Sequence, residues 1–149
     1  QNGYAIGLAK MRLDGFVSIE GYDPGGTFTT VPMNADGDQL IVNLRAPDHE
    51  FGNGRGTELP FGTVTVEVLD VEGRIIEGYS VGDCDSFTGD ELRHVVTWNH
   101  SSDLSRVVKS TFRLRFHLKN AALYSFQFVG GSQHKDIVNL LSPGARGHF

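Results

Sequence analysis

Cysteine is almost absent from this chain, and long apolar runs and an excess of basic charge are absent altogether. The single Cys84 cannot form an internal disulfide, so the fold has to rest on a hydrophobic core. No apolar run approaches the roughly 18 to 20 residues that span a bilayer, so we expect no membrane insertion. The formal net charge of -5 argues against nucleic acid, because phosphate binding requires a basic surface.

Catalytic signatures are also scarce. Neither a phosphate-binding loop nor a short-spaced Cys/His zinc pattern occurs, and we expect no nucleophile elbow. The histidines are scattered, which favours hydrogen-bonded or solvated roles over metal ligation. A small hydrolase built on His94 or His100 with Asp90 is the competing hypothesis, but no nucleophile beside these residues is visibly activated. We therefore expect no enzyme, no metal and no cofactor.

What the chain does contain is glycine and alternating apolar residues. It has 39% hydrophobic residues and 19 glycines against 5 prolines, which is typical of a globular fold with tight turns. Val64, Val66 and Val68 alternate with polar neighbours, as do the apolar residues of 111–119. Further candidate strands are 6–12, 15–20, 27–32, 39–44, 74–80, 94–99 and 122–129. Without a convincing amphipathic helix, this pattern predicts an all-β antiparallel β-sandwich or jelly roll of about nine strands with little helix.

Turn and loop signals divide these strands. Asp36-Gly37 and Glu72-Gly73 are predicted to form tight hairpin turns, because both supply a residue that tolerates positive φ. Arg45 to Gly62, rich in glycine, reads as one long loop, where binding often resides. We expect one β-sandwich domain over 1–128 and a C-terminal extension over 129–149 that is peripheral or a contact arm.

Aromatic residues suggest a sugar platform, because the C–H faces of sugar rings stack on aromatic rings. Trp98 is the only tryptophan, and a role in the core is the alternative for it. The tyrosines that could join a platform are Tyr4, Tyr22, Tyr79 and Tyr124. The candidate ligand-binding residues are Trp98, Tyr79, His100, Asp83, Asp85 and Asp90.

Two groups of carboxylates remain open to interpretation. Asp83, Asp85, Asp90 and Glu91 loosely resemble a calcium site, although the regular spacing of an EF-hand loop is missing and turn capping is the simpler role. A carboxylate pair for glycoside cleavage would have to converge across a cleft, which the sequence cannot establish for Glu20, Glu67, Asp70 and Glu77. We expect Glu67 and Glu77 on the solvent faces of strands.

Four ordered motifs carry a family resemblance: IGLAKMRLDGFVSIE, VTVEVLDVEGRIIEGYS, DCDSFTGD followed by VTWNHSSDL, and RLRFHLKNAALYSFQF. Together they make residues 5–128 similar to the C-terminal β-sandwich module of bacterial and marine secreted proteins of the glycoside-hydrolase type, in which a five-bladed propeller is catalytic. The long loop and the tail after Phe128 are additions to that pattern. The resemblance implies a secreted, non-catalytic accessory domain associated with carbohydrate, whose catalytic partner lies elsewhere on the parent chain.

Two functions follow from these observations. The first is carbohydrate association or binding, with a polysaccharide as partner. The second is a structural module that packs against copies of itself through edge strands and terminal segments, as a homo-oligomer. The sequon Asn99-His100-Ser101 also points toward an extracellular location in a eukaryotic host.

Overall fold

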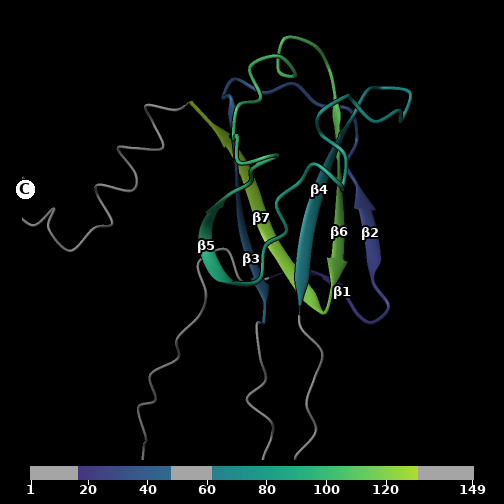
Figure 1. The fold of residues 1–149 in the computed structure, drawn as a ribbon, viewed down its shortest axis with the longest axis vertical. Helices are drawn as coiled ribbons and strands as arrows, with labels where there is room; N and C mark the ends of the chain where they lie inside the picture. The colour runs from purple at the N-terminus through teal and green to yellow at the C-terminus, as the bar shows by residue number, and fades with distance from the viewer. Residues whose placement is uncertain (1–16, 48–61, 131–149) are drawn as a thin grey trace, which may run out of the picture.

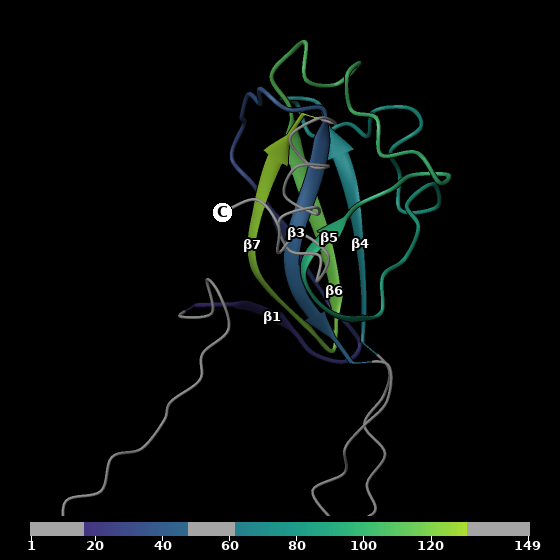
Figure 2. The same ribbon diagram turned by 90° about the vertical axis from the view of Figure 1, so that its left-hand side faces the viewer.

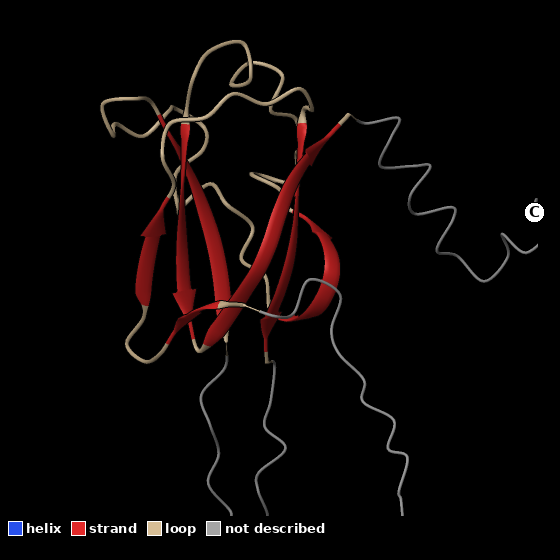
Figure 3. Cartoon of the chain, turned by 180° about the vertical axis from the view of Figure 1, so that it is seen from behind, coloured by secondary structure: helices blue, strands red, loops and turns tan. Residues whose placement is uncertain are grey.

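The described part of the chain is built from β-strands. The computed structural model describes residues 17–47 and 62–130. The strands are β1 (Ile19–Gly21), β2 (Gly26–Thr29), β3 (Gln39–Ala46), β4 (Thr63–Leu69), β5 (Gly89–Val95), β6 (Arg113–Lys119) and β7 (Ala121–Val129). Neither described range contains a helix (Figure 3), so none there is long and apolar enough to cross a membrane.

The strands form two antiparallel sheets in a sandwich-like arrangement. Sheet A has the order β1-β7-β3-β5, and sheet B has the order β2-β6-β4. In Figure 1, β3, β5 and β7 lie on the left and β2, β4 and β6 on the right. Figure 2 views the sandwich from the β7, β3 and β5 side, with β1 crossing the lower end. The first strand pairs with the last, β1 with β7. The next ones inward also pair, β2 with β6 and β3 with β5, and β4 lies at the centre of this order.

One hydrophobic core fills the space between the sheets. From β4 it receives three buried valines, Val64, Val66 and Val68, and from β6 it receives Leu114, Phe116 and Leu118. These are the residues that alternate with polar neighbours in the sequence, so both strand predictions are confirmed. Each fully buried side chain of this size contributes about 1.5 to 3 kcal/mol, which makes the core the main source of stability.

Two segments expected to be strands take other forms. Residues 74–80 form no strand, and only Ile75 makes an isolated bridge, to Leu69. The chain instead reverses in the expected turn at Glu72-Gly73, where Gly73 has φ +86°, and runs back along the edge of β4. β5 overlaps only the first two residues of the predicted strand 94–99. Its earlier residues were not predicted as strand, because they are polar and show no apolar alternation.

The predicted hairpin at Asp36-Gly37 is wrong. β2 and β3 belong to different sheets, so this segment crosses from one sheet to the other. A Cβ on Gly37 would lie 2.4 Å from the carbonyl carbon of Val129. The glycine is therefore required by the close approach of two backbones rather than by a tight reversal.

Several predicted boundaries shift. β3 continues through Arg45 to Ala46, so the predicted loop starts later, and residues 48–61 of it lie outside the described residues. Its two ends are adjacent, since the Gly62 amide donates to the Pro47 carbonyl at 2.8 Å. β7 begins at Ala121, one residue before the predicted strand 122–129, and ends at Val129 as predicted. The candidate strand 6–12, Tyr4 and the extension from 131 onward also lie outside the described residues.

Candidate functional site

Trp98 and Tyr79 lie in the core. The Trp98 side chain is buried, and its Nε1 donates to the Val66 carbonyl at 2.8 Å. The Tyr79 ring meets the Trp98 ring edge-on at 5.3 Å, and its hydroxyl donates to the Asp103 carbonyl at 2.9 Å. Neither ring presents a face to solvent, so these two residues form no sugar platform in this structure.

Asp83 and Asp85 hold turns together. Asp83 Oδ2 accepts from the Ser80 hydroxyl at 2.7 Å, and Asp85 Oδ2 accepts from the Thr97 hydroxyl at 2.6 Å and from the His100 amide at 2.7 Å. These hydrogen bonds lower the pKa of both carboxyls. They support the turn at Asn99-His100, where both residues have positive φ (48° and 65°). This geometry is that of turn capping.

Asp90 lies apart from this cluster. It stands on β5 opposite Arg45 of β3. Within the described ranges, no group of three or more His, Cys, Asp or Glu side chains is arranged to hold a metal ion. The His100 side chain is 94% exposed, and its backbone rather than its ring makes the close contact with Asp85. Five of the six predicted ligand-binding residues therefore lie on two contacting turns, 79–85 and 98–101, and only Asp90 stands apart from them.

Against expectation, the sequence contains one nucleophile-elbow pattern. Residues 78–82 read Gly-Tyr-Ser-Val-Gly, which matches the nucleophile-elbow pattern G-x-S-x-G. An elbow places its serine between a strand and a helix, but no helix follows Ser80 among the described residues. The Ser80 hydroxyl donates to Asp83 in a turn instead. The match carries no nucleophile geometry.

Glu67 is buried, against expectation, whereas Glu77 is exposed as expected but lies in a turn rather than on a strand. The segment after β4 folds back over the outer face of sheet B and places the Val81 amide 3.4 Å from Glu67 Oε1. Burial raises the pKa of the Glu67 carboxyl, but the hydrogen bond and charge of His117, the Val81 amide and the charge of Arg115 together outweigh burial and lower it. Glu67 is thus an internal ion-pair residue.

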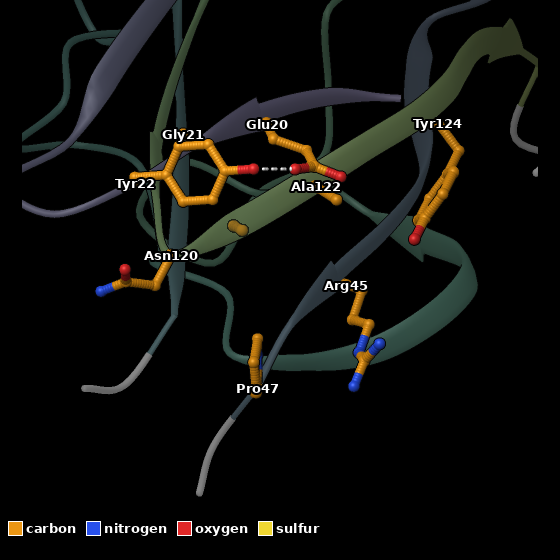
Figure 4. Close-up of a pocket in the computed structure, with 9 residues that line it drawn as sticks. Glu20, Gly21, Tyr22, Arg45, Pro47, Asn120, Ala122 and Tyr124 are labelled. Atoms are coloured by element: carbon orange, nitrogen blue, oxygen red, sulfur yellow. Dashed lines mark hydrogen bonds between the residues drawn. The ribbon is translucent and has the colours of Figure 1, made fainter. Parts of the chain in front are cut away.

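A hollow of about 360 Å³ lies on sheet A beside β1 (Figure 4). Its floor follows one row of directly paired residues: Glu20 of β1, Ala122 of β7 and Arg45 of β3. Side chains alternate across a strand, and the neighbouring Leu123 and Leu44 belong to the core. The row therefore faces outward. The volume lies within the range of small-molecule pockets.

Two tyrosines border this hollow. Figure 4 shows Tyr22 and Tyr124 on opposite sides of Ala122. Tyr22 is 71% exposed and its hydroxyl donates to Glu20, which also accepts from the Ser18 hydroxyl at 3.1 Å. The hydrogen bonds from Tyr22 and Ser18 lower the pKa of the Glu20 carboxyl, and the bond to Glu20 raises the pKa of the Tyr22 phenol. The carboxylate is thus held ionised and oriented.

The remaining wall combines a cation with small residues. Arg45, which is exposed, and Pro47 come from the end of β3, and Asn120 comes from the corner between β6 and β7. The arginine makes no side-chain hydrogen bond or ion pair with any described residue. The hollow therefore offers two rings for stacking, an acceptor at Glu20 and a donor at Arg45.

Two backbone features place these side chains. A register shift between Asn43 and Leu44 leaves Tyr124 as the extra residue of β7, which forms a bulge, and bulges re-aim side chains. A Cβ on Gly21 would lie 2.3 Å from the Leu118 carbonyl oxygen. Glycine at this position thus lets β1 lie against the end of β6, with Glu20 and Tyr22 on the outer side.

Sequence reasoning considered Tyr22, Tyr124 and Glu20 separately and did not place them together. The signal that unites them is the long-range pairing of β1 with β7, which no local pattern reveals. Arg45 was predicted to lie in a loop, because the proline and glycines that follow it are loop signals and obscure where β3 ends. No family model, no curated protein and no solved structure matches the chain.

Proposed function

We propose that this chain is a non-catalytic accessory domain that binds carbohydrate through the hollow bounded by Tyr22 and Tyr124. The observation that carries the proposal is that two tyrosine rings, one oriented carboxylate and one guanidinium without an ion-pair partner among the described residues line the same shallow outer face. Sugar rings present apolar C–H faces and hydroxyl edges, which match stacking surfaces and fixed polar groups respectively. The family resemblance supports the same function.

The accessory role is part of the proposal. The resemblance implies a secreted parent chain whose catalytic domain is separate from this one. In agreement with that role, the residues that line the hollow include no activated nucleophile. The Glu20 carboxylate, for example, is engaged by Tyr22 and Ser18 rather than paired with a second carboxylate across a cleft.

We also propose a jelly roll as the complete fold. Nested pairs β1–β7, β2–β6 and β3–β5 describe one long hairpin wrapped around a core. The position beside β4 is occupied by two segments that make isolated bridges to it at Ile75 and Phe87. This edge corresponds to an eighth strand that is irregular.

Affinity gel electrophoresis tests the binding proposal. The wild type is run through gels containing xylan, mannan, mixed-linkage β-glucan or polygalacturonate, and we expect retardation by at least one of them. Tyr22→Ala and Tyr124→Ala should each weaken binding about tenfold, the equivalent of about 1.4 kcal/mol per lost ring. Ile75→Ala, an exposed apolar residue at the distant turn, should bind like the wild type. Free migration of the wild type in every gel would sink the proposal.

A second candidate function is self-assembly. A hollow beside β1 is lined by Val17, Ile19, Phe28 and Phe126, and Val17 is 76% exposed. Exposed apolar residues beside an edge strand favour packing against another copy. Light scattering over a concentration series should give a dimer mass that Val17→Ser with Ile19→Ser reduces to a monomer. A monomer at every concentration would refute this candidate.

A further inference from the structure

A second hollow lies on the same outer face of sheet A. It has a volume of about 140 Å³ and lies where β5, β3 and β7 run side by side. Its polar lining comes from all three strands: Arg93 from β5, Asn43 from β3, and Ser125 and Gln127 from β7. The binding hollow is thus not the only concave region on this face within the described residues.

The two hollows are neighbours. Asn43 of the second hollow and Arg45 of the first lie two positions apart on β3, and therefore on the same face. On β7, Tyr124 borders the first hollow and the next residue, Ser125, borders the second, because the bulge turns both outward. From Ala122 to Gln127 the strand advances by about 17 Å at about 3.3 Å per residue. One sugar ring is much shorter than this distance.

The charges on this face are balanced. Glu20 and Asp90 supply carboxylates, and Arg45 and Arg93 supply guanidinium groups, within a chain whose formal net charge is -5. Like Arg45, Arg93 makes no side-chain hydrogen bond or ion pair with another described residue. On such a face an acidic polymer gains no net electrostatic attraction, since the carboxylates offset the guanidinium groups, and the negative net charge of the chain opposes its approach. A hydroxyl-rich neutral polymer can use donors and acceptors together.

We infer that the ligand is an uncharged polysaccharide chain that lies along β7 across both hollows, with one sugar between Tyr22 and Tyr124 and later sugars beside Arg93 and Gln127. This inference rests on the proposed function. It adds that recognition requires several consecutive sugars and is not confined to a chain end or a single ring. It also predicts little dependence on salt, because no ion pair with the ligand is formed.

Calorimetric titration with oligosaccharides tests this inference. Di-, tri-, tetra- and hexasaccharides of xylan, mannan and β-glucan are titrated into the wild type, and we expect affinity to rise about tenfold or more between the shortest and the longest of the bound series. Arg93→Ala and Gln127→Ala should each abolish this rise. Tyr22→Ala should weaken every length. Arg74→Ala, whose side chain is 75% exposed on the distant turn, is the matched control and should change nothing.

The possible results separate the two proposals. Equal affinity for di- and hexasaccharide, or full length dependence in Arg93→Ala, would overturn the extended-chain inference while the binding function stands. In the affinity gels, stronger retardation by polygalacturonate than by the neutral polysaccharides, weakened by added salt, would overturn the neutral-ligand inference. Absence of binding to every probe would refute the binding function itself.

Discussion

His117 Nε2 lies 2.9 Å from Glu67 Oε2 on the outer face of sheet B, and Glu67 is buried there. The pKa of the Glu67 carboxyl is lower in the fold than its ordinary value of 4.5, so the ionised form favours the folded state. Its contribution is present above the ordinary pKa and is lost as the pH falls through the lowered one. We expect Glu67→Gln to cost about 1 to 3 kcal/mol near neutral pH.

Urea unfolding at several pH values measures this cost. The difference between wild type and Glu67→Gln should shrink steadily as the pH is lowered from about 5 to about 2, because the wild-type carboxylate becomes protonated. Glu77→Gln, at an exposed position, is the matched control and should unfold like the wild type. A Glu67→Gln penalty that is the same at all pH values would contradict the ion-pair role.

Gly21→Ala should destabilise the protein and weaken carbohydrate binding together. The new Cβ would lie 2.3 Å from the Leu118 carbonyl oxygen, so β1 has to move, and overpacking of this kind costs about 1 to 3 kcal/mol. Thermal unfolding and affinity gels measure the two effects. Gly82→Ala is the control, because its Cβ would have only an ordinary contact with Ser80 at 3.7 Å. Unchanged stability in Gly21→Ala would show that β1 lies elsewhere.

Trp98→Phe should destabilise the protein without affecting carbohydrate binding. It removes the hydrogen bond to the Val66 carbonyl and leaves space in the core, for an expected loss of about 2 kcal/mol. Circular dichroism during urea unfolding measures this loss. Val31→Ala, at a position that is 74% exposed, should fall within about 0.5 kcal/mol of the wild type. Loss of carbohydrate binding in a folded Trp98→Phe variant would instead support the hypothesis that Trp98 forms a sugar-binding platform.

Cys84 should be unreactive in the folded protein. Burial raises the pKa of its thiol to about 11, so roughly a thousandth of it is thiolate near pH 8, and only the thiolate attacks a disulfide reagent. Labelling with an aromatic disulfide should be slow in buffer and fast in guanidinium chloride. Equally rapid labelling in both solutions would place Cys84 at the surface.

Local patterns predicted those strands that bury one face. Val64, Val66 and Val68 alternate and are buried, because β4 faces the core with one side only. β5 was predicted only at its last two residues, since an edge strand that carries Asp90 and Glu91 has no such alternation. The burial of Glu67 was not predicted for a different reason. The segment after β4 covers the outer face of sheet B at this position, and the alternation within a strand gives no information about such coverage.

The candidate site was the least predictable part. Its residues come from β1, β3 and β7 and the corner at Asn120, so they meet only when pairing between distant strands is known. Trp98 and Tyr79 were predicted to bind ligand because aromatic residues occur both in cores and in sugar-binding platforms. Only burial distinguishes the two roles, and burial depends on the whole fold.

The corner at Asn120 has one further consequence. This single residue, with φ +46°, joins β6 of one sheet to β7 of the other, and it also lines the binding hollow. A connection this short leaves the two sheets no freedom to slide at that end of the sandwich. In the proposed binding mode, a ligand would meet a backbone that this corner already fixes, so we expect association to lose little conformational entropy and its rate to be set by encounter rather than by rearrangement.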